Sequence, residues 1–283
     1  MRGWWQDLTD LVLPAECGGC GRPRAVLCPE CRAALTGDVP SRVRPEPEPP
    51  GLPVVYAAAP YEDEVRAALL AHKERGALTL AVPLGAALAG AVRAGLGSVG
   101  RAGTGGSRAA LLLVPVPSAR WAVRARGHDP ARRIALAAAA ELRRGGTPTR
   151  VLAVLRQRRA VADQSGLNSR QRLDNLAGAL EVAPGGARLL ADGGRIVLVD
   201  DLMTTGASLA EAARALRAAL PEGEGFYGRV TPGTTGEEAA RTAMTGVGRA
   251  EAVREKSDVN SAEGGIGAAV VAASPASFEI NRN

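Results

Sequence analysis

The sequence predicts an α/β protein with a central, mostly parallel sheet flanked by helices and preceded by a small cysteine-rich module. Short apolar runs alternate with amphipathic segments, which is the pattern of parallel strands joined by helices. Hydrophobic residues make up 46% and charged residues 23% of the 283 residues, so a globular core is expected. All four Cys lie within residues 17–31, which excludes a scaffold held together by disulfides.

The first expected unit, residues 1–36, is a zinc-binding module. Its cysteines form two pairs, Cys17-x-x-Cys20 and Cys28-x-x-Cys31, a spacing that places four thiolates around one tetrahedral Zn²⁺. Four thiolates leave no open position for catalysis, so the zinc is expected to be structural. The alternatives are a redox pair or free thiols. Residues 37–53 follow, and their six prolines predict a semi-rigid linker.

The expected α/β domain covers residues 54–283 and begins with a strand over 54–59. An amphipathic helix over 61–76 presents Val65 and Leu69 on one face. A second helix follows over 78–96, and the apolar run 111–117 predicts a buried strand.

The second half of this domain continues the alternation. The segment 129–146 predicts a helix with Asp129 as N-cap and Pro130 in the first turn. The remaining expected elements are strands over 151–155 and 178–183 joined by a long polar arm, a strand over 195–201, a helix over 207–220 and a strand over 268–273. Residues 221–266 break the rhythm, and we interpret them as an inserted mobile loop.

Composition restricts the compartment and the partners. The formal net charge is +6, a mild bias toward anionic partners. Asp7 and Asp10 interrupt the segment where a signal peptide needs an apolar core. The longest uncharged stretch, 77–92, is shorter than the roughly 20 residues that a membrane span requires. We therefore expect a cytoplasmic protein without membrane insertion.

The most informative motif runs from Arg195 to Leu209. A buried strand ends in Asp200 and Asp201, and a turn rich in hydroxyl groups leads directly into a helix. The free N–H groups of a helix start favour a phosphate, and two adjacent carboxylates suit vicinal sugar hydroxyls. The predicted ligand is a sugar phosphate with free 2- and 3-hydroxyls. The alternative is a capped helix after an ordinary turn.

This motif resembles the PRPP (phosphoribosyl pyrophosphate) site of type I phosphoribosyltransferases. With the two Cys pairs upstream, and with RARGHDPARRIALAAA (124–139) and DQSGLNSRQRLDNLAGAL (163–180) between, the chain resembles the ComF family. The resemblance covers residues 10–220 and 266–283. It implies a type I phosphoribosyltransferase-like domain behind a zinc module, and an association with DNA uptake during competence.

The resemblance also implies roles for individual residues. Asp200 and Asp201 would hold the ribose hydroxyls, and both, with Arg170, are the candidate catalytic residues. The 5-phosphate would be bound by Thr204, Thr205, Gly206, Ala207 and Ser208. The pyrophosphate would be bound by Arg120, Arg124, Arg126, Gly127 and Lys73. The alternative for the arginines is a solvated basic face.

The arm over 156–177 resembles the mobile hood loop of such enzymes, with Gln164, Arg170, Arg172 and Asn175 at the family spacing. The alternative is a surface arm that binds polyanions nonspecifically.

Two functions remain open at this point. The first is a phosphoribosyltransferase that uses PRPP with Mg²⁺ and an unidentified acceptor and releases pyrophosphate. The second is a non-catalytic component of DNA uptake, or a sensor of PRPP or a nucleotide. The expected partners are PRPP, the acceptor, DNA or competence proteins, and a second copy of the chain.

Overall fold

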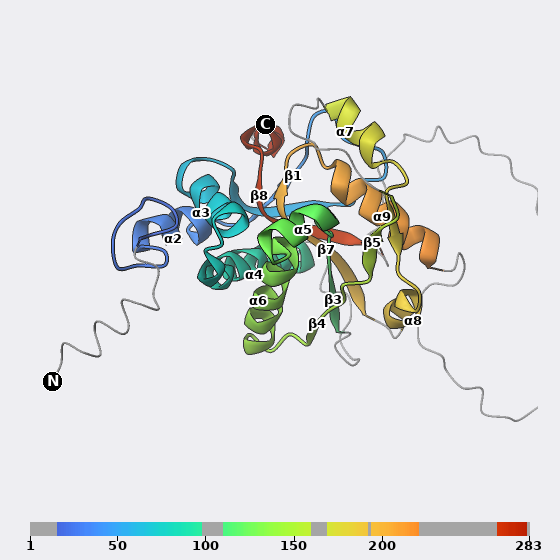
Figure 1. Cartoon of the computed structure of the whole chain (residues 1–283), viewed down its shortest axis with the longest axis horizontal. Coiled ribbons are helices and arrows are strands. Elements are labelled where there is room, and N and C mark those ends of the chain that lie inside the picture. The colour runs from blue at the N-terminus through green and yellow to red at the C-terminus, as the bar shows by residue number, and fades with distance from the viewer. Residues whose placement is uncertain (1–15, 98–109, 160–168, 192–193, 221–264, 282–283) are drawn as a thin grey trace, which may run out of the picture.

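A computed structural model describes residues 16–97, 110–159, 169–191, 194–220 and 265–281 (Figure 1). Its centre is a six-stranded sheet in the order β1-β2-β8-β7-β3-β4. Five of these strands are parallel: β2 (Val55–Pro60), β8 (Gly267–Ala273), β7 (Arg195–Met203), β3 (Leu111–Pro115) and β4 (Thr149–Val151). The expected α/β architecture with a mostly parallel sheet is confirmed.

Helices cover both faces of the sheet. On one face, α4 (Ala81–Gly97) and α6 (Pro130–Arg144) pack on Leu113, Val197 and Val271. On the other face, α9 (Ala207–Ala219) packs on Leu112, Leu198 and Val270. Because successive strand residues alternate between faces, the continuous apolar runs of β3, β7 and β8 fill both halves of the core.

Close packing of α4 against α6 requires a small residue at one position. A Cβ added to Gly85 would lie 2.5 Å from the Ala137 Cβ and 2.8 Å from the Ala138 nitrogen. Glycine at this position therefore lets the two helices approach each other, and α6 is fixed on the sheet through α4 as well as by its own apolar face. The start of α6 follows the sequence prediction, since Asp129 accepts a hydrogen bond from the Arg132 N–H at 3.1 Å.

The Pro-rich segment 37–53 differs from the expected free linker. Ser41–Val43 forms strand β1, which pairs antiparallel with β2 at the edge of the main sheet. Val43 and Leu52 are buried in the core beside α9. An edge strand loses few ladder hydrogen bonds to neighbouring prolines, so a Pro-rich composition is compatible with this position.

Smaller elements surround the sheet. Two short strands, β5 (Leu155–Gln157) and β6 (Leu180–Val182), form a separate antiparallel pair. The expected strand 151–155 is thus divided between the ends of β4 and β5. The other elements are α2 (Pro29–Thr36), α3 (Asp63–Glu74), η1 (Leu78–Leu80), α5 (Arg120–Arg126), α7 (Ser169–Leu176), α8 (Gly186–Ala191) and η2 (Pro275–Asn281). The proposed inserted loop lies outside the described residues, except for its last positions.

Among the described residues, one helical stretch, Leu78–Gly97, is long and apolar enough to cross a membrane by length and composition alone. Over its apolar window, 56% is buried within the protein. It packs against α6, β2 and β8, so its apolar surface is accounted for by the core.

Candidate functional site

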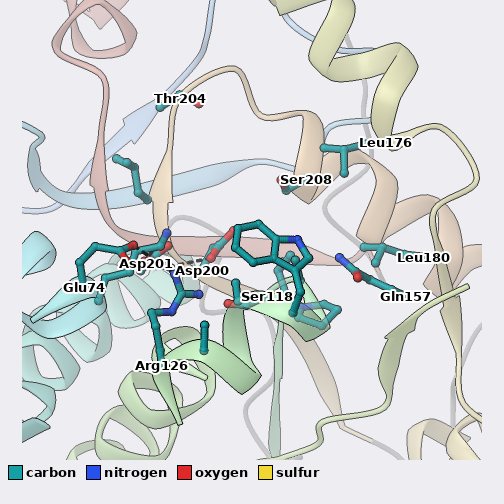
Figure 2. Close-up of a pocket in the computed structure, with 18 residues that line it drawn as sticks. Glu74, Ser118, Arg126, Gln157, Leu176, Leu180, Asp200, Asp201, Thr204 and Ser208 are labelled. Atoms are coloured by element: carbon teal, nitrogen blue, oxygen red, sulfur yellow. Dashed lines mark hydrogen bonds and ion pairs between the residues drawn. The ribbon is translucent and has the colours of Figure 1, made fainter. Parts of the chain in front are cut away.

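A pocket of about 480 Å³ opens at the carboxyl ends of β3 and β7 (Figure 2). From β3 the chain continues through α5 into α6, which covers one face of the sheet, and then into β4. From β7 it continues into α9 on the opposite face and on to β8. Two adjacent strands whose connections leave in opposite directions make a crevice, the usual ligand position in parallel α/β sheets. Residues 116–119, which follow β3, line the pocket together with the last part of β7 (Asp200, Asp201 and Leu202) and with Thr204 just after it.

Asp200 and Asp201 both line the pocket, but they differ in their partners. Asp201 is buried, and its Oδ2 lies 3.0 Å from Lys73 Nζ. The backbone N–H of Asp201 donates to Oδ1 of Asp200 at 2.9 Å. Asp200 forms no ion pair with the other described residues, and the nearby Lys73 charge offsets its negative charge only in part. The structure thus brings the two predicted carboxylates together (Figure 2), and Lys73 lies beside Asp201.

This arrangement raises the pKa of both Asp200 and Lys73. Desolvation raises the pKa of the Asp200 carboxyl well above its ordinary value, although part of the residue remains accessible, and the neighbouring Asp201 charge raises it further. The Asp201 carboxylate raises the pKa of Lys73, which favours the charged ammonium. Asp200 is therefore a carboxyl group whose negative charge is poorly compensated in the described structure.

The turn after β7 leads into α9 through Gly206, whose φ of 73° is a conformation that favours glycine. A Cβ at this position would also lie 3.1 Å from Leu52. No side chain caps the start of α9, so its first N–H groups have no capping partner and can bind an anion. Thr204 and Ser208 line the pocket, whereas Thr205, Gly206 and Ala207 contribute the backbone of the turn.

The expected pyrophosphate loop is the helix α5, and this divides its arginines. Arg126 lines the pocket, with 15% of its side chain exposed, and lies 3.1 Å from Glu74 Oε1. Arg120 and Arg124 are exposed and do not line the pocket. Residues four apart share a helix face, so Arg120 and Arg124 lie on one face while Ala122 and Arg126 lie on the other. Gly127 ends the helix with a φ of 75°.

Two buried histidines, His72 and His128, are close in the chain to Lys73 and Arg126 and form a pair. The ring centroids of His72 and His128 are 5.6 Å apart. Nε2 of His128 lies 3.2 Å from the His72 carbonyl oxygen, and Nδ1 lies 3.2 Å from the Arg126 carbonyl oxygen. Burial lowers the pKa of His72. The pair joins the end of α3 to the turn between α5 and α6, and no local sequence pattern predicts it.

The opposite side of the pocket has residues that the sequence motifs did not identify. Leu176, Leu180 and Gln157 come from the arm and its two short strands (Figure 2). Trp121 also lines the pocket and is 60% exposed, although it directly follows Arg120 in the expected loop. Of the arm residues predicted to act in the site, Gln164 lies outside the described residues, and only the backbone of Arg170 is described, in α7.

The four cysteines form a second candidate site, separate from the pocket. Their sulfur atoms all lie within 4.8 Å of one another, and Cys20 Sγ and Cys28 Sγ are 3.6 Å apart. A tetrahedral ion with metal–sulfur bonds of about 2.3 Å holds its sulfurs roughly 3.8 Å apart. The cysteines are therefore close enough to bind one metal ion.

Backbone N–H groups around the cysteines favour the thiolate form of Cys17. Burial by itself raises the pKa of Cys17, but backbone hydrogen bonds from Cys20, Cys28 and Gly19 outweigh it and lower the pKa to about 6. The Cys28 N–H lies 3.3 Å from the Cys17 sulfur. Burial and the neighbouring thiols raise the pKa of Cys31, and the pKa of Cys28 is also raised, so of these three thiols only Cys17 favours the thiolate, the form that binds metals.

No known family model matches the chain, and no curated protein matches it significantly.

Proposed function

We propose that the pocket binds PRPP and that the protein is a phosphoribosyltransferase-like member of the ComF family. The observation that carries this proposal is the meeting of two features in one pocket. Asp200 and Asp201 lie near the carboxyl end of β7, and the start of α9 follows that end after one short turn. A phosphate and a pair of sugar hydroxyls a few bonds away are complementary to these two features.

The charges favour this orientation of the ligand. The 5-phosphate would lie at the N–H groups that begin α9, with the Thr204 and Ser208 hydroxyls as further donors. The ribose hydroxyls would donate to Asp200 and Asp201. Asp200 is the group with most to gain, because hydroxyl donors would stabilise a carboxylate that desolvation and Asp201 disfavour.

The other end of the ligand would lie against Lys73 and Arg126. Both cations line the pocket, and both are held by acidic partners, Asp201 and Glu74. A pyrophosphate group would exchange these carboxylates for its own oxygens. Mg²⁺, when bound with PRPP, would add charge neutralisation at the same place. Asp200 and Asp201 offer the hard oxygen ligands that it prefers.

The reaction that follows is displacement of pyrophosphate from C1 of the ribose by an acceptor nucleophile. The bond from C1 to the pyrophosphate oxygen breaks as the bond from C1 to the acceptor forms. The protein would hold the two reactants in line and stabilise the charge on the leaving group through Lys73 and Arg126. Gln157, Leu176 and Leu180 would border the acceptor.

For the cysteine cluster we propose one structural Zn²⁺. Three of the four cysteines are buried, and the same apolar cluster includes Leu27, Leu35 and the buried faces of α3 and α4. A closed set of four sulfurs leaves no position for a substrate. The ion would therefore fix the cysteine module on the α/β domain.

The test is pyrophosphate release from PRPP with Mg²⁺ and a panel of nitrogenous bases, after PRPP binding has been measured by equilibrium dialysis. Binding together with acceptor-dependent release supports a transferase. The matched control is Asp200→Asn, which should no longer release pyrophosphate from PRPP but should keep the fold. A wild-type protein that fails to bind PRPP would contradict the proposal.

A second candidate is a non-catalytic PRPP sensor that acts in DNA uptake. The observation that favours it is the absence of a histidine among the described pocket-lining residues. The most frequent general base is therefore missing from that lining, which leaves the carboxylates Glu74, Asp200 and Asp201 as the remaining groups of that kind. PRPP binding without release for any acceptor would select this function.

A further inference from the structure

The helix α7 lies beside the start of α9. Leu173 and Leu176 of α7 share a small apolar cluster with Ala207, the first residue of α9. Ala207 and Leu176 are both buried. The helix α7 is therefore packed onto the turn that forms the candidate phosphate site (Figure 1).

From α7, the Arg172 side chain reaches this turn. Its Nη1 donates to Thr204 Oγ1 at 3.1 Å. Its Nε is buried and has no hydrogen-bond partner among the residues that the structure describes. The contact with Thr204 is exposed, so the terminal nitrogens of the guanidinium, which carry further N–H donors, are the ones that a ligand can reach.

Neighbouring arginines of the arm are engaged elsewhere. Arg156 donates to Glu181 across the β5–β6 pair at 2.8 Å. Arg159 donates to the carbonyl oxygens of Asn175 and Ala177, both at 2.9 Å. Arg156 and Arg159 thus stabilise the arm itself. Arg172 instead contacts a residue of the α9 turn.

We infer that Arg172 is a further binding residue for the phosphate monoester end of the ligand. This inference rests on the proposed function, because it concerns the anion at the start of α9. An anion placed there would accept from Arg172 beside the backbone N–H groups. Arg offers several donors in one plane, which suits phosphate oxygens.

The hydrogen bond to Thr204 gives this arrangement a second effect. The Thr204 oxygen accepts from Arg172, so its own hydroxyl proton remains available to a third group. A phosphate at the turn would accept that proton. Arg172 would thereby orient the Thr204 hydroxyl and bind the anion directly, and occupancy of the turn would hold α7 against α9.

The test compares Arg172→Gln and Arg172→Lys with the matched control Arg156→Gln, which removes the same charge from the same arm. Ribose 5-phosphate and pyrophosphate are titrated separately into each protein by calorimetry. Arg172→Gln should weaken ribose 5-phosphate roughly tenfold or more, since a hydrogen bond to a charged group is lost. It should leave pyrophosphate binding unchanged, and Arg172→Lys should retain part of the affinity.

The outcomes separate this inference from the function on which it rests. Wild-type protein that does not bind ribose 5-phosphate would overturn the proposed function and the inference together. Wild-type binding with an unchanged Arg172→Gln variant would overturn the inference alone. Equal losses for ribose 5-phosphate and pyrophosphate, or an equal loss in Arg156→Gln, would show a general effect on the arm and would also overturn it.

Discussion

The cysteine cluster and the pocket are built in opposite ways. The four sulfurs come from one stretch of fifteen residues, 17–31, and three of the four cysteines are buried. The pocket is assembled from α3, α5, α7, α9 and the ends of several strands, and its lining includes exposed side chains such as Trp121 and Thr204. A closed, local set of ligands suits an ion that stays bound. An open set from distant segments suits a ligand that must enter and leave.

The largest expected effect lies on the cysteine side of this comparison. Cys28→Ser should remove the metal and lower the free energy of unfolding by several kcal/mol, because metal binding is coupled to folding of such modules. Zinc content by elemental analysis and urea denaturation measure the two effects. Asp200→Asn is the control and should keep its zinc. A Cys28→Ser protein of unchanged stability would mean that the cluster is not structural.

On the pocket side, the two adjacent aspartates should respond in opposite directions. Asp201→Asn should destabilise the fold by roughly 1–2 kcal/mol, because Lys73 loses its partner. Asp200→Asn should stabilise it at neutral pH, because it removes a poorly compensated carboxylate. Chemical denaturation of both variants at pH 7 measures the difference.

The sign of the Asp200 effect follows from its raised pKa. A carboxyl whose pKa is higher in the folded state contributes stability below its unfolded pKa of about 3.9 and loses it as the pH rises through the folded pKa. The gain from Asp200→Asn should therefore grow from acidic to neutral pH. A destabilised Asp200→Asn protein at pH 7 would show that Asp200 is compensated by a group outside this account.

A smaller effect should separate the arginines of α5. Arg126→Gln should weaken pyrophosphate and PRPP binding roughly tenfold, the effect of one lost charged hydrogen bond. Arg124→Gln is the matched control on the exposed face and should change little. Titration of both ligands into both variants provides the measurement. Equal losses would place the pyrophosphate somewhere other than the inner face of α5.

The smallest effect concerns the buried His72. Burial lowers its pKa in the folded state, so below about pH 6.5 the unfolded chain binds the proton first and stability falls. Wild-type protein should lose more stability between pH 7 and pH 5 than His72→Asn does. Urea midpoints across this range test it. If the stability of the two proteins changed with pH in parallel, His72 would not contribute to the pH dependence of stability.

The same contrast explains how much the sequence could predict. Cysteine spacing and the Asp129 N-cap are local patterns, and each lies where it was expected. The strand expected over 195–201 also forms, but it continues two residues beyond the aspartates, to Met203. The helix over 120–126 was missed, because an Arg-rich segment after a strand fits a turn as well as a helix. Only the phase of that helix separates Arg126 from Arg124.

Long-range pairings were beyond the sequence patterns for a different reason. Strand β1 is short and lies among prolines, so composition favoured a linker, yet pairing with β2 and burial of Val43 fix it at the sheet edge. The His72–His128 pair and the Arg172–Thr204 hydrogen bond join residues that are 56 and 32 positions apart. Neither follows from any spacing within one segment.

The central claim is that Asp200, Asp201 and the start of α9 form one binding site for a phosphoribosyl group. Calorimetric titration of PRPP with Mg²⁺ into wild type and an Asp200→Asn, Asp201→Asn double variant tests it most directly. We expect one site per chain in wild type and a loss of roughly 2–4 kcal/mol of binding free energy in the double variant, since each charged hydrogen bond contributes about 1.5–3 kcal/mol. Undiminished PRPP binding by a folded double variant would contradict the claim.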